Sequence, residues 1–434
     1  KKSDTVLAWD LGNECNCMSE TDRIGAANWT SIIANAIRAE DSTRLVVSGM
    51  HTLDVASNAT WRIEDQAMFT DILTTHPYPF WCRHTRIDKT LSLRTTMHAT
   101  AETKLYSEIG GKPCMAEEIG RMGPMVCSDE NAASFLRLNL FSLWANNSAG
   151  AMWWCANDQT MLSAFPYSKN MIELELGMID KNHRPKPILK ELKKFSEFLD
   201  KLDFELPKAE VDAVCLLTED QRQWGVAYMT YILLRQSGLN CSFAYADNEL
   251  PKSGLYLVPS VRDVVVMRKK NYEELRRRVY EGADVYISVD NGFLSEFKEF
   301  TGLKVDDSYE CDEEDSFILD GVEIGFMRKR NYALTSVGAT IIAHDRSGNP
   351  AIAVNNYGKG RVFFVNFPLE DNLIDTHDAF GGNEHLVYKK LFGGYADSHP
   401  IKVSDKDIAV TYHRMGEKMI VVFINHSDKA RKAE

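Results

Sequence analysis

Two motifs that end strand-like apolar runs carry the residues best suited to chemistry. The first ends in Asn13-Glu14, and the second ends in Glu117-Glu118. A carboxyl group at the end of a strand commonly caps the next helix or lies in an exposed turn. If two such groups converge, however, one can donate a proton to a leaving oxygen while the other attacks carbon. That pair of roles suits the hydrolysis of a glycosidic bond, with the pKa of the acid raised and the nucleophile ionised.

The spacing of the two motifs predicts that they meet. Glu14 and Glu118 are 104 positions apart (118 minus 14). One β/α unit of an eight-stranded parallel barrel takes roughly 31 residues, so this separation corresponds to about three units. Because the carboxyl ends of barrel strands form one rim, both groups are expected at the same rim.

The surrounding sequence supports an α/β fold in three parts. Residues 1–204 alternate strand-like runs with helical patterns, which predicts parallel strands joined by crossovers. The expected strands are 5–11, 44–48, 72–76, 113–117 and 149–154, and the expected helices include 26–40, 91–109 and 130–146. Residues 205–395 show a second, doubly wound α/β pattern, and residues 396–434 begin a β-rich domain. The acidic run Glu310–Asp315 is predicted to be a solvated loop.

Composition excludes several classes of function. The net charge is −12, from 50 basic and 62 acidic residues, so the attraction that drives nucleic-acid binding is missing. No uncharged apolar run reaches the ~18–20 residues of a membrane helix. The nine cysteines form no Cys-x-x-Cys pair, which favours reduced thiols, a cytoplasmic location and no metal cluster.

The two motifs resemble the signatures of a large clan of retaining (β/α)8 glycoside hydrolases that includes families 5 and 42. Asn13-Glu14 is similar to the clan's strand-4 motif, and Glu118-Ile119-Gly120 to its strand-7 motif. The resemblance implies that Glu14 is the acid/base, that Glu118 is the nucleophile, and that Asn13 binds the sugar 2-hydroxyl. Glu117 is the rival nucleophile. Glu118 is preferred because the clan motif places the nucleophile two residues before glycine, and because neighbouring strand residues point to opposite sides.

Three further residues match the same clan. His76-Pro77-Tyr78 resembles its strand-6 motif, which implies that Tyr78 contacts the nucleophile and that His76 orients the acid/base or touches sugar. A structural histidine in a proline-rich turn is the alternative. Trp154 is similar to the strand-8 tryptophan that stacks on sugar, and Trp153 is then expected in the core. His51 is a further candidate for the pocket. Additional candidate sugar contacts are Arg121, Asn157, Asp158 and Gln159.

The resemblance leaves out the first three strands of such a barrel and continues into a second domain. Three strands, roughly 100 residues, should precede Glu14 in such a barrel. The sequence therefore resembles a fragment that holds strands 4–8, and its function is predicted for the longer protein. Residues 205–395 resemble the amidotransferase-like domain that forms trimers in family 42, which implies a possible homotrimer. No cysteine follows the run 255–259, so glutaminase chemistry is not expected there.

The sequence as a whole predicts a retaining exo-β-glycosidase of the β-galactosidase or β-mannosidase type. Its expected partner is a carbohydrate substrate, with no cofactor, catalytic metal, nucleic acid or membrane. An endo-acting β-mannanase or cellulase is one alternative. A non-catalytic carbohydrate-binding or assembly protein is the other.

Overall fold

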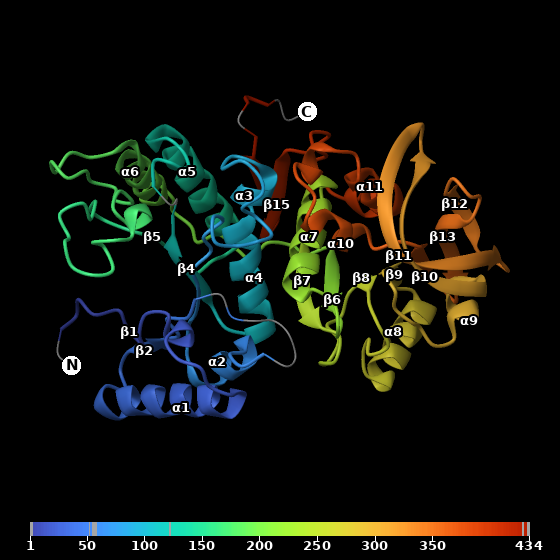
Figure 1. Ribbon diagram of the computed structural model, residues 1–434, viewed down its shortest axis with the longest axis horizontal. Helices are drawn as coiled ribbons and strands as arrows, with labels where there is room; N and C mark the ends of the chain where they lie inside the picture. Colours follow the sequence, from blue (N-terminus) through green and yellow to red (C-terminus); the bar gives the residue numbers. More distant parts are fainter. Residues whose placement is uncertain (1–2, 52, 54–58, 121–122, 428, 432–434) are drawn as a thin grey trace. The chain divides into compact units, whose positions relative to one another are not determined.

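The computed structural model describes residues 3–51, 53, 59–120, 123–427 and 429–431 (Figure 1). The chain divides into two compact units. Unit 1 consists of residues 1–210 and 407–433, and unit 2 of residues 211–406. The domain ends expected from the sequence were 204 and 395. The C-terminal segment, which was expected to begin a separate β-rich domain, is grouped with unit 1.

Unit 1 contains an arc of parallel strands that follow one another in chain order. They are β1 (Ala8–Asp10), β2 (Leu45–Val47), β3 (Leu73–Thr75), β4 (Cys114–Ile119) and β5 (Ala151–Trp153). Parallel ladders join β1 to β2, β3 to β4 and β4 to β5, and a parallel bridge between Val47 and Ile72 joins β2 to β3. Because all five strands run in one direction, their carboxyl ends share one edge. The predicted barrel-type α/β fold class is confirmed.

Local signals in the sequence fix the helices between these strands. The helices are α1 (Arg23–Glu40), α2 (Ile63–Phe69), α3 (Leu93–Thr96), α4 (His98–Gly110), α5 (Asp129–Ala145) and α6 (Pro187–Leu199). Asp22 caps α1 by accepting a hydrogen bond from the Gly25 amide at 2.7 Å. Gly111 ends α4 in the left-handed region, where a residue without Cβ is favoured. The single helix expected over 91–109 is broken at Met97.

The C-terminal hairpin is part of unit 1 because its residues bond to that unit. β15 (Ile408–Met415) pairs with β16 (Lys418–Asn425). His413 of β15 forms a bridge with Ala209, and a hydrogen bond of 2.9 Å joins Thr96 Oγ1 to His426 Nδ1. These contacts link residues far apart in sequence, which no local pattern could indicate.

Unit 2 is built on a seven-stranded sheet with the order β12–β13–β14–β9–β8–β6–β7. Its strands are β6 (Ala213–Leu217), β7 (Cys241–Tyr245), β8 (Leu255–Val261), β9 (Asp284–Val289), β12 (Thr340–His344), β13 (Pro350–Tyr357) and β14 (Gly360–Val365). The five strands from β7 to β14 are parallel, and β13 and β12 extend the sheet in antiparallel fashion. The helices are α7 (Gln223–Gln236), α8 (Lys269–Glu281), α9 (Phe297–Thr301), α10 (Leu369–Ile374) and α11 (His385–Ala396). This is the doubly wound pattern that the sequence predicts.

A long antiparallel hairpin in unit 2 corrects one expectation. β10 (Leu303–Leu319) pairs with β11 (Val322–Ser336), and the acidic run Glu310–Asp315 lies inside β10. The predicted loop is therefore wrong, although the side chains of the run are exposed or half-buried as expected. The physical reason is charge compensation across the hairpin, since Arg330 lies opposite Glu310 and pairs with it at 3.0 Å.

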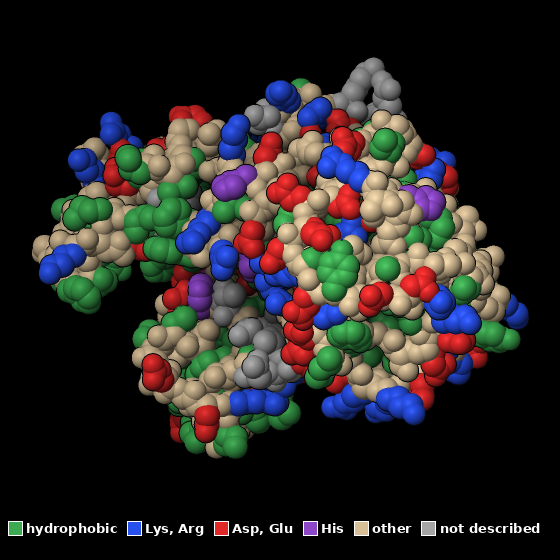
Figure 2. Space-filling view, turned by 45° about the vertical axis from the view of Figure 1, so that its right-hand side comes forward, with side chains coloured by type: hydrophobic (Ala, Val, Ile, Leu, Met, Phe, Trp, Pro, Cys, Tyr) green, Lys and Arg blue, Asp and Glu red, His purple; other side chains and the backbone are tan. Residues whose placement is uncertain are grey.

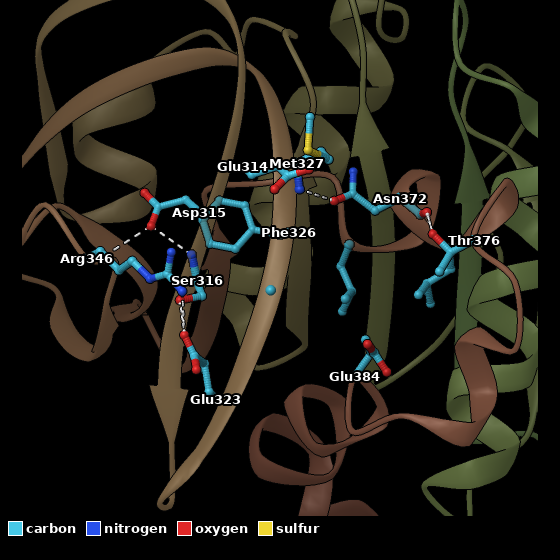
Figure 3. Close-up of a pocket in the computed structure, with 13 residues that line it drawn as sticks. Glu314, Asp315, Ser316, Glu323, Phe326, Met327, Arg346, Asn372, Thr376 and Glu384 are labelled. Carbon is cyan, nitrogen blue, oxygen red and sulfur yellow. Dashed lines mark hydrogen bonds and ion pairs between the residues drawn. The ribbon is translucent and has the colours of Figure 1, made fainter.

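The hairpin borders a cavity of about 540 Å³ in unit 2. Figure 3 shows Arg346, Asp315 and Glu323 on one side of this cavity and Glu384 on another. Phe326 and Leu369 supply part of its apolar lining. On the face that Figure 2 displays, acidic and basic side chains are interspersed. No helix within the described residues is long and apolar enough to cross a membrane.

The buried carboxylate of Glu370 accepts hydrogen bonds from four side-chain hydroxyls of unit 2. Tyr286 and Tyr388 each donate a hydroxyl hydrogen bond of 2.7 Å to Glu370 Oε1. Ser288 and Ser260 donate to Oε2 at 2.6 and 2.8 Å. Ser260 stands near the end of β8 and is 2% exposed, and its hydroxyl is occupied by the hydrogen bond to Glu370.

We expect Glu370→Gln to destabilise unit 2 by about 1–3 kcal/mol, because an amide can accept from only one side and leaves buried hydroxyls unsatisfied. Hydrogen–deuterium exchange of the β8 and β9 amides measures this effect in the intact protein. The same change at the exposed Glu299 is the matched control and should alter exchange little. Equal exchange in the two variants would contradict the structural role of Glu370.

Candidate active site

Five consecutive parallel strands of unit 1 each deliver a polar or aromatic side chain to one edge. Glu14 follows β1, His51 follows β2 and His76 follows β3. Glu117 and Glu118 lie near the end of β4, and Trp154 follows β5. In parallel α/β folds this edge is where functional groups gather. The structure therefore brings the two sequence motifs to one place, as their spacing predicts.

The first centre of the site is Glu14. Its backbone adopts the left-handed region with φ of 49°, and its amide donates to the Gly49 carbonyl at 2.8 Å. This turn directs the carboxylate toward two imidazoles. Glu14 Oε1 lies 2.8 Å from His76 Nδ1 and 3.3 Å from His51 Nδ1. His51, predicted only as a possible pocket residue, is thus a direct neighbour of Glu14.

The second centre is Glu118. The buried Tyr78 hydroxyl donates a hydrogen bond of 2.6 Å to Glu118 Oε2. The same oxygen lies 3.7 Å from His76 Nδ1. Since Glu14 Oε1 is 2.8 Å from that nitrogen, the two carboxylate oxygens are at most 6.5 Å apart, the sum of 2.8 and 3.7 Å.

Glu117 does not point away from the site, contrary to the alternation argument. Its Oε2 lies 3.3 Å from His76 Nε2, so Glu117 and Glu118 approach the same imidazole from its two nitrogens. The expectation that they face opposite sides of the strand is wrong. The ladder between β4 and β5 has a register shift between Ala116 and Ile119, and such an irregularity interrupts strict alternation.

The two tryptophans separate as the sequence suggests. Trp153 is 8% exposed in the core, and its indole N–H donates to the Leu176 carbonyl at 3.1 Å. Trp154 is half-buried and packs against Tyr78. Its indole also contacts Glu173, a site-edge carboxylate that the sequence reasoning missed.

The remaining candidates differ in their surroundings. Asn13 is exposed next to Glu14. Asp158 has a structural role, since it pairs with Lys186 at 2.6 Å and accepts a hydrogen bond from the Gly177 amide at 3.0 Å. Arg121 lies outside the described residues. Asp10, which was not singled out from the sequence, lies beside Glu117.

The electrostatics of the two carboxyls are the reverse of the arrangement expected from sequence. Contacts with His51 and His76 lower the pKa of Glu14 to about 2. Burial raises the pKa of Glu118, and neighbouring Glu14 and Glu117 add to this, although His76 and Tyr78 oppose it. The reason is that Glu14 lies within 3.3 Å of both imidazoles, whereas Glu118 lies 3.7 Å from His76 Nδ1.

The imidazole of His76 carries the positive charge that offsets the neighbouring carboxylates. Burial of its ring disfavours the cation, but hydrogen bonds to Glu117 and Glu14 outweigh this effect and raise the pKa of His76 to about 9. Burial, together with the nearby charge of Glu118, raises the pKa of Tyr78, so its hydroxyl stays a donor at neutral pH. Desolvation and the neighbouring Glu117 raise the pKa of Asp10 to about 6.

The geometry of Glu14, His51 and His76 also bears on metal binding. One ligand-type atom from each of the three lies within 4.8 Å of the others. A metal requires a free lone pair on each nitrogen. His76 directs both ring nitrogens at carboxylates, so we interpret this group as an ion-pair cluster.

Comparison with known proteins supports the fold. No protein-family model and no curated protein matches the sequence. Among solved structures, the exo-β-1,4-mannosidase Op5Man5 from Opitutaceae bacterium strain TAV5 is similar with a TM-score of 0.73 and 18% identity, over 88% of this chain and 72% of that one. The β-galactosidase from Rahnella sp. R3 is similar with a TM-score of 0.69 and 14% identity, over 93% and 62%.

A third similar structure is Gan42B, a GH42 β-galactosidase from G. stearothermophilus. Its TM-score is 0.66 at 13% identity, over 95% of this chain and 64% of that one. The chain thus spans less than two thirds of both β-galactosidases. At these identities the likeness establishes the fold, and it confirms the predicted resemblance to barrel glycoside hydrolases at that level.

The charge on His76 predicts a pH-dependent contribution to stability. Because the pKa is raised on folding, the contribution is complete below the unfolded value of about 6.5 and is lost as pH rises through about 9. The stability advantage of the native protein over His76→Gln should therefore fall by roughly 1–3 kcal/mol between pH 6 and pH 9.5. Urea denaturation at both pH values measures it. His344→Gln, at an exposed histidine, is the control, and an advantage that does not change with pH would refute the charged state.

Proposed function

We propose that the protein is a retaining exo-β-glycosidase that cleaves O-glycosidic bonds through a covalent glycosyl-enzyme. The observation that carries the proposal is the convergence of Glu14 and Glu118 on one nitrogen of His76. Retaining enzymes place their carboxyl groups about 5–5.5 Å apart, whereas inverting enzymes need about 6.5–9.5 Å for an intervening water. The upper bound of 6.5 Å between the two oxygens favours the retaining arrangement.

Glu118 is the better placed nucleophile of the two carboxylates on β4. Its Oε2 accepts the Tyr78 hydrogen bond, which holds the carboxylate in one orientation and favours its ionised form. Glu117 instead bonds to the far side of His76 and has no comparable approach to Glu14. In this assignment Glu118 attacks the anomeric carbon and forms a glycosyl ester. Glu14 passes a proton to the leaving oxygen and later removes one from water.

Carbohydrate is the substrate class that best fits the neighbouring surface. Trp154 presents an indole beside the carboxylate pair, and a flat aromatic ring can stack on the apolar face of a pyranose. Glu173, which the Trp154 indole contacts, and the exposed Asn13 next to Glu14 are the candidate partners for sugar hydroxyls. The exo mode is supported by the likeness to an exo-β-1,4-mannosidase. The names of this protein and of the similar β-galactosidases give mannose and galactose as the first sugars to test.

Removal of the nucleophile charge tests this assignment. Glu118→Gln should lower kcat on an aryl β-mannoside or β-galactoside by about 10³-fold or more, because an amide cannot form the glycosyl ester. Binding of the sugar, measured by calorimetry, should persist. Glu175→Gln changes an exposed carboxylate in the loop after Trp154 and should leave kcat unchanged. An active Glu118→Gln protein would rule out the proposed nucleophile.

Azide distinguishes the two carboxylate roles. Glu14→Ala with an activated aryl glycoside should be rescued by azide and give a glycosyl azide of retained configuration, because the glycosyl ester on Glu118 still forms. Glu118→Ala should give the azide of inverted configuration, because azide then attacks the sugar directly. NMR of the products reads both results. The opposite pattern would exchange the roles of Glu14 and Glu118.

A further inference from the structure

The imidazole of His76 has two carboxylate neighbours where a neutral ring could satisfy only one. Its Nδ1 lies 2.8 Å from Glu14 Oε1, and its Nε2 lies 3.3 Å from Glu117 Oε2. A neutral imidazole has one N–H and one lone pair, so one of these contacts would set a lone pair against a carboxylate oxygen. Both contacts are favourable when the ring carries both protons. The side chain of His76 is fully buried, so water cannot relieve the conflict.

The charges around His76 support the same state. Glu14 from β1, and Glu117 and Glu118 from β4, all lie within 4 Å of its nitrogens. The carboxyl groups of Asp10 and Glu102 lie at longer range, and burial raises the pKa of both. Among the described residues, the imidazole of His51 also lies against this group, with its ring centroid 6.1 Å from that of His76. Three carboxylates packed against a neutral ring would leave like charges uncompensated.

We propose that His76 stores the proton that the leaving group needs, and that Glu117 is the positioning residue that keeps it there. Glu117 accepts the Nε2–H, so the proton that the ring can give up is the one on Nδ1, which faces Glu14. The proton therefore belongs to the Glu14–His76 pair, rather than to Glu14 alone. This inference rests on the proposed glycosidase function for its catalytic part, although the state of His76 does not depend on it.

The proton transfers balance in both half-reactions. In the first, Glu118 Oε2 or its partner oxygen bonds to the anomeric carbon as the bond to the leaving oxygen breaks. Glu14, ionised at rest, takes the proton from His76 Nδ1 and passes it to that oxygen, so Glu14 ends ionised and His76 ends neutral. In the second, water attacks the anomeric carbon, the ester bond to Glu118 breaks, and the proton lost by water returns through Glu14 to His76.

The position of Glu118 couples the proton to the bond change. Its carboxylate lies 3.7 Å from His76 Nδ1 and stabilises the cation by attraction. When Glu118 becomes an ester it loses its charge, and His76 holds its proton less tightly. The proton is thus released as the leaving group departs. Deglycosylation restores the charge of Glu118 and draws the proton back.

Glu117→Gln tests this proposal in the full-length protein. The substitution removes a negative charge from His76 Nε2, so the pKa of His76 should fall by about 1–3 units. The alkaline limb of the kcat/KM profile should move to lower pH by the same amount, because that profile reports the free enzyme. The His76 pKa is read by ¹⁵N NMR of histidine-labelled protein, with the signal assigned by its loss in His76→Gln. Glu175→Gln should shift neither quantity.

The outcomes separate this proposal from the function on which it builds. If the pKa of His76 falls in Glu117→Gln but the alkaline limb of the kcat/KM profile does not move, His76 does not store the catalytic proton. The proposed glycosidase function would not be affected by that result. A wild-type protein in which the limb and the His76 pKa differ by more than a unit would overturn the proton store too, even if Glu117→Gln did not fold. Absence of any glycoside hydrolysis, with His76 titrating as expected, would instead reject the proposed function.

Discussion

The proposed chemistry of unit 1 depends on one buried imidazole, that of His76. His76 lies between Glu14 and Glu118 on one nitrogen and Glu117 on the other, and its side chain has no exposed surface. Three carboxylates this close together repel one another unless a cation sits among them. The charge of His76 therefore allows Glu14 and Glu118 to remain near enough to act on one sugar ring. The directions of their pKa shifts, opposite to those expected from the sequence, follow from the same arrangement, since both imidazoles lie within 3.3 Å of Glu14.

The backbone places these groups by small departures from regular structure. The left-handed turn at Glu14 and the register shift between Ala116 and Ile119 each reorient a carboxylate at a strand end. Close packing makes glycine necessary nearby, because a Cβ on Gly49 would lie 1.9 Å from Asp10 Oδ1. A Cβ on Gly120 would lie 2.9 Å from the Trp154 carbonyl oxygen. The glycine of the second motif thus lets β4 and the segment after β5 approach each other.

The sequence was a good guide to the order of elements and to which residues meet. Period and spacing predicted the five strands of unit 1 and the convergence of Glu14 with Glu118, because parallel strands bring their ends to one edge. They could not predict that Glu117 also turns toward His76, since the irregularity in β4 arises from pairing with β5. The acidic strand β10 was missed because the arginines that compensate it lie on the next strand. Asp10 and Glu173 were not predicted as site residues, because only the folded chain brings them beside Glu117 and Trp154.

The central claim is that Glu118 forms the covalent bond to sugar while Glu14 and His76 manage the proton. Trapping with 2-deoxy-2-fluoro β-mannosyl and β-galactosyl fluorides, followed by peptide mass spectrometry of the full-length protein, tests this most directly. The account predicts a single glycosyl adduct on Glu118. An adduct on Glu14 or Glu117, or turnover with inversion and no adduct, would contradict it.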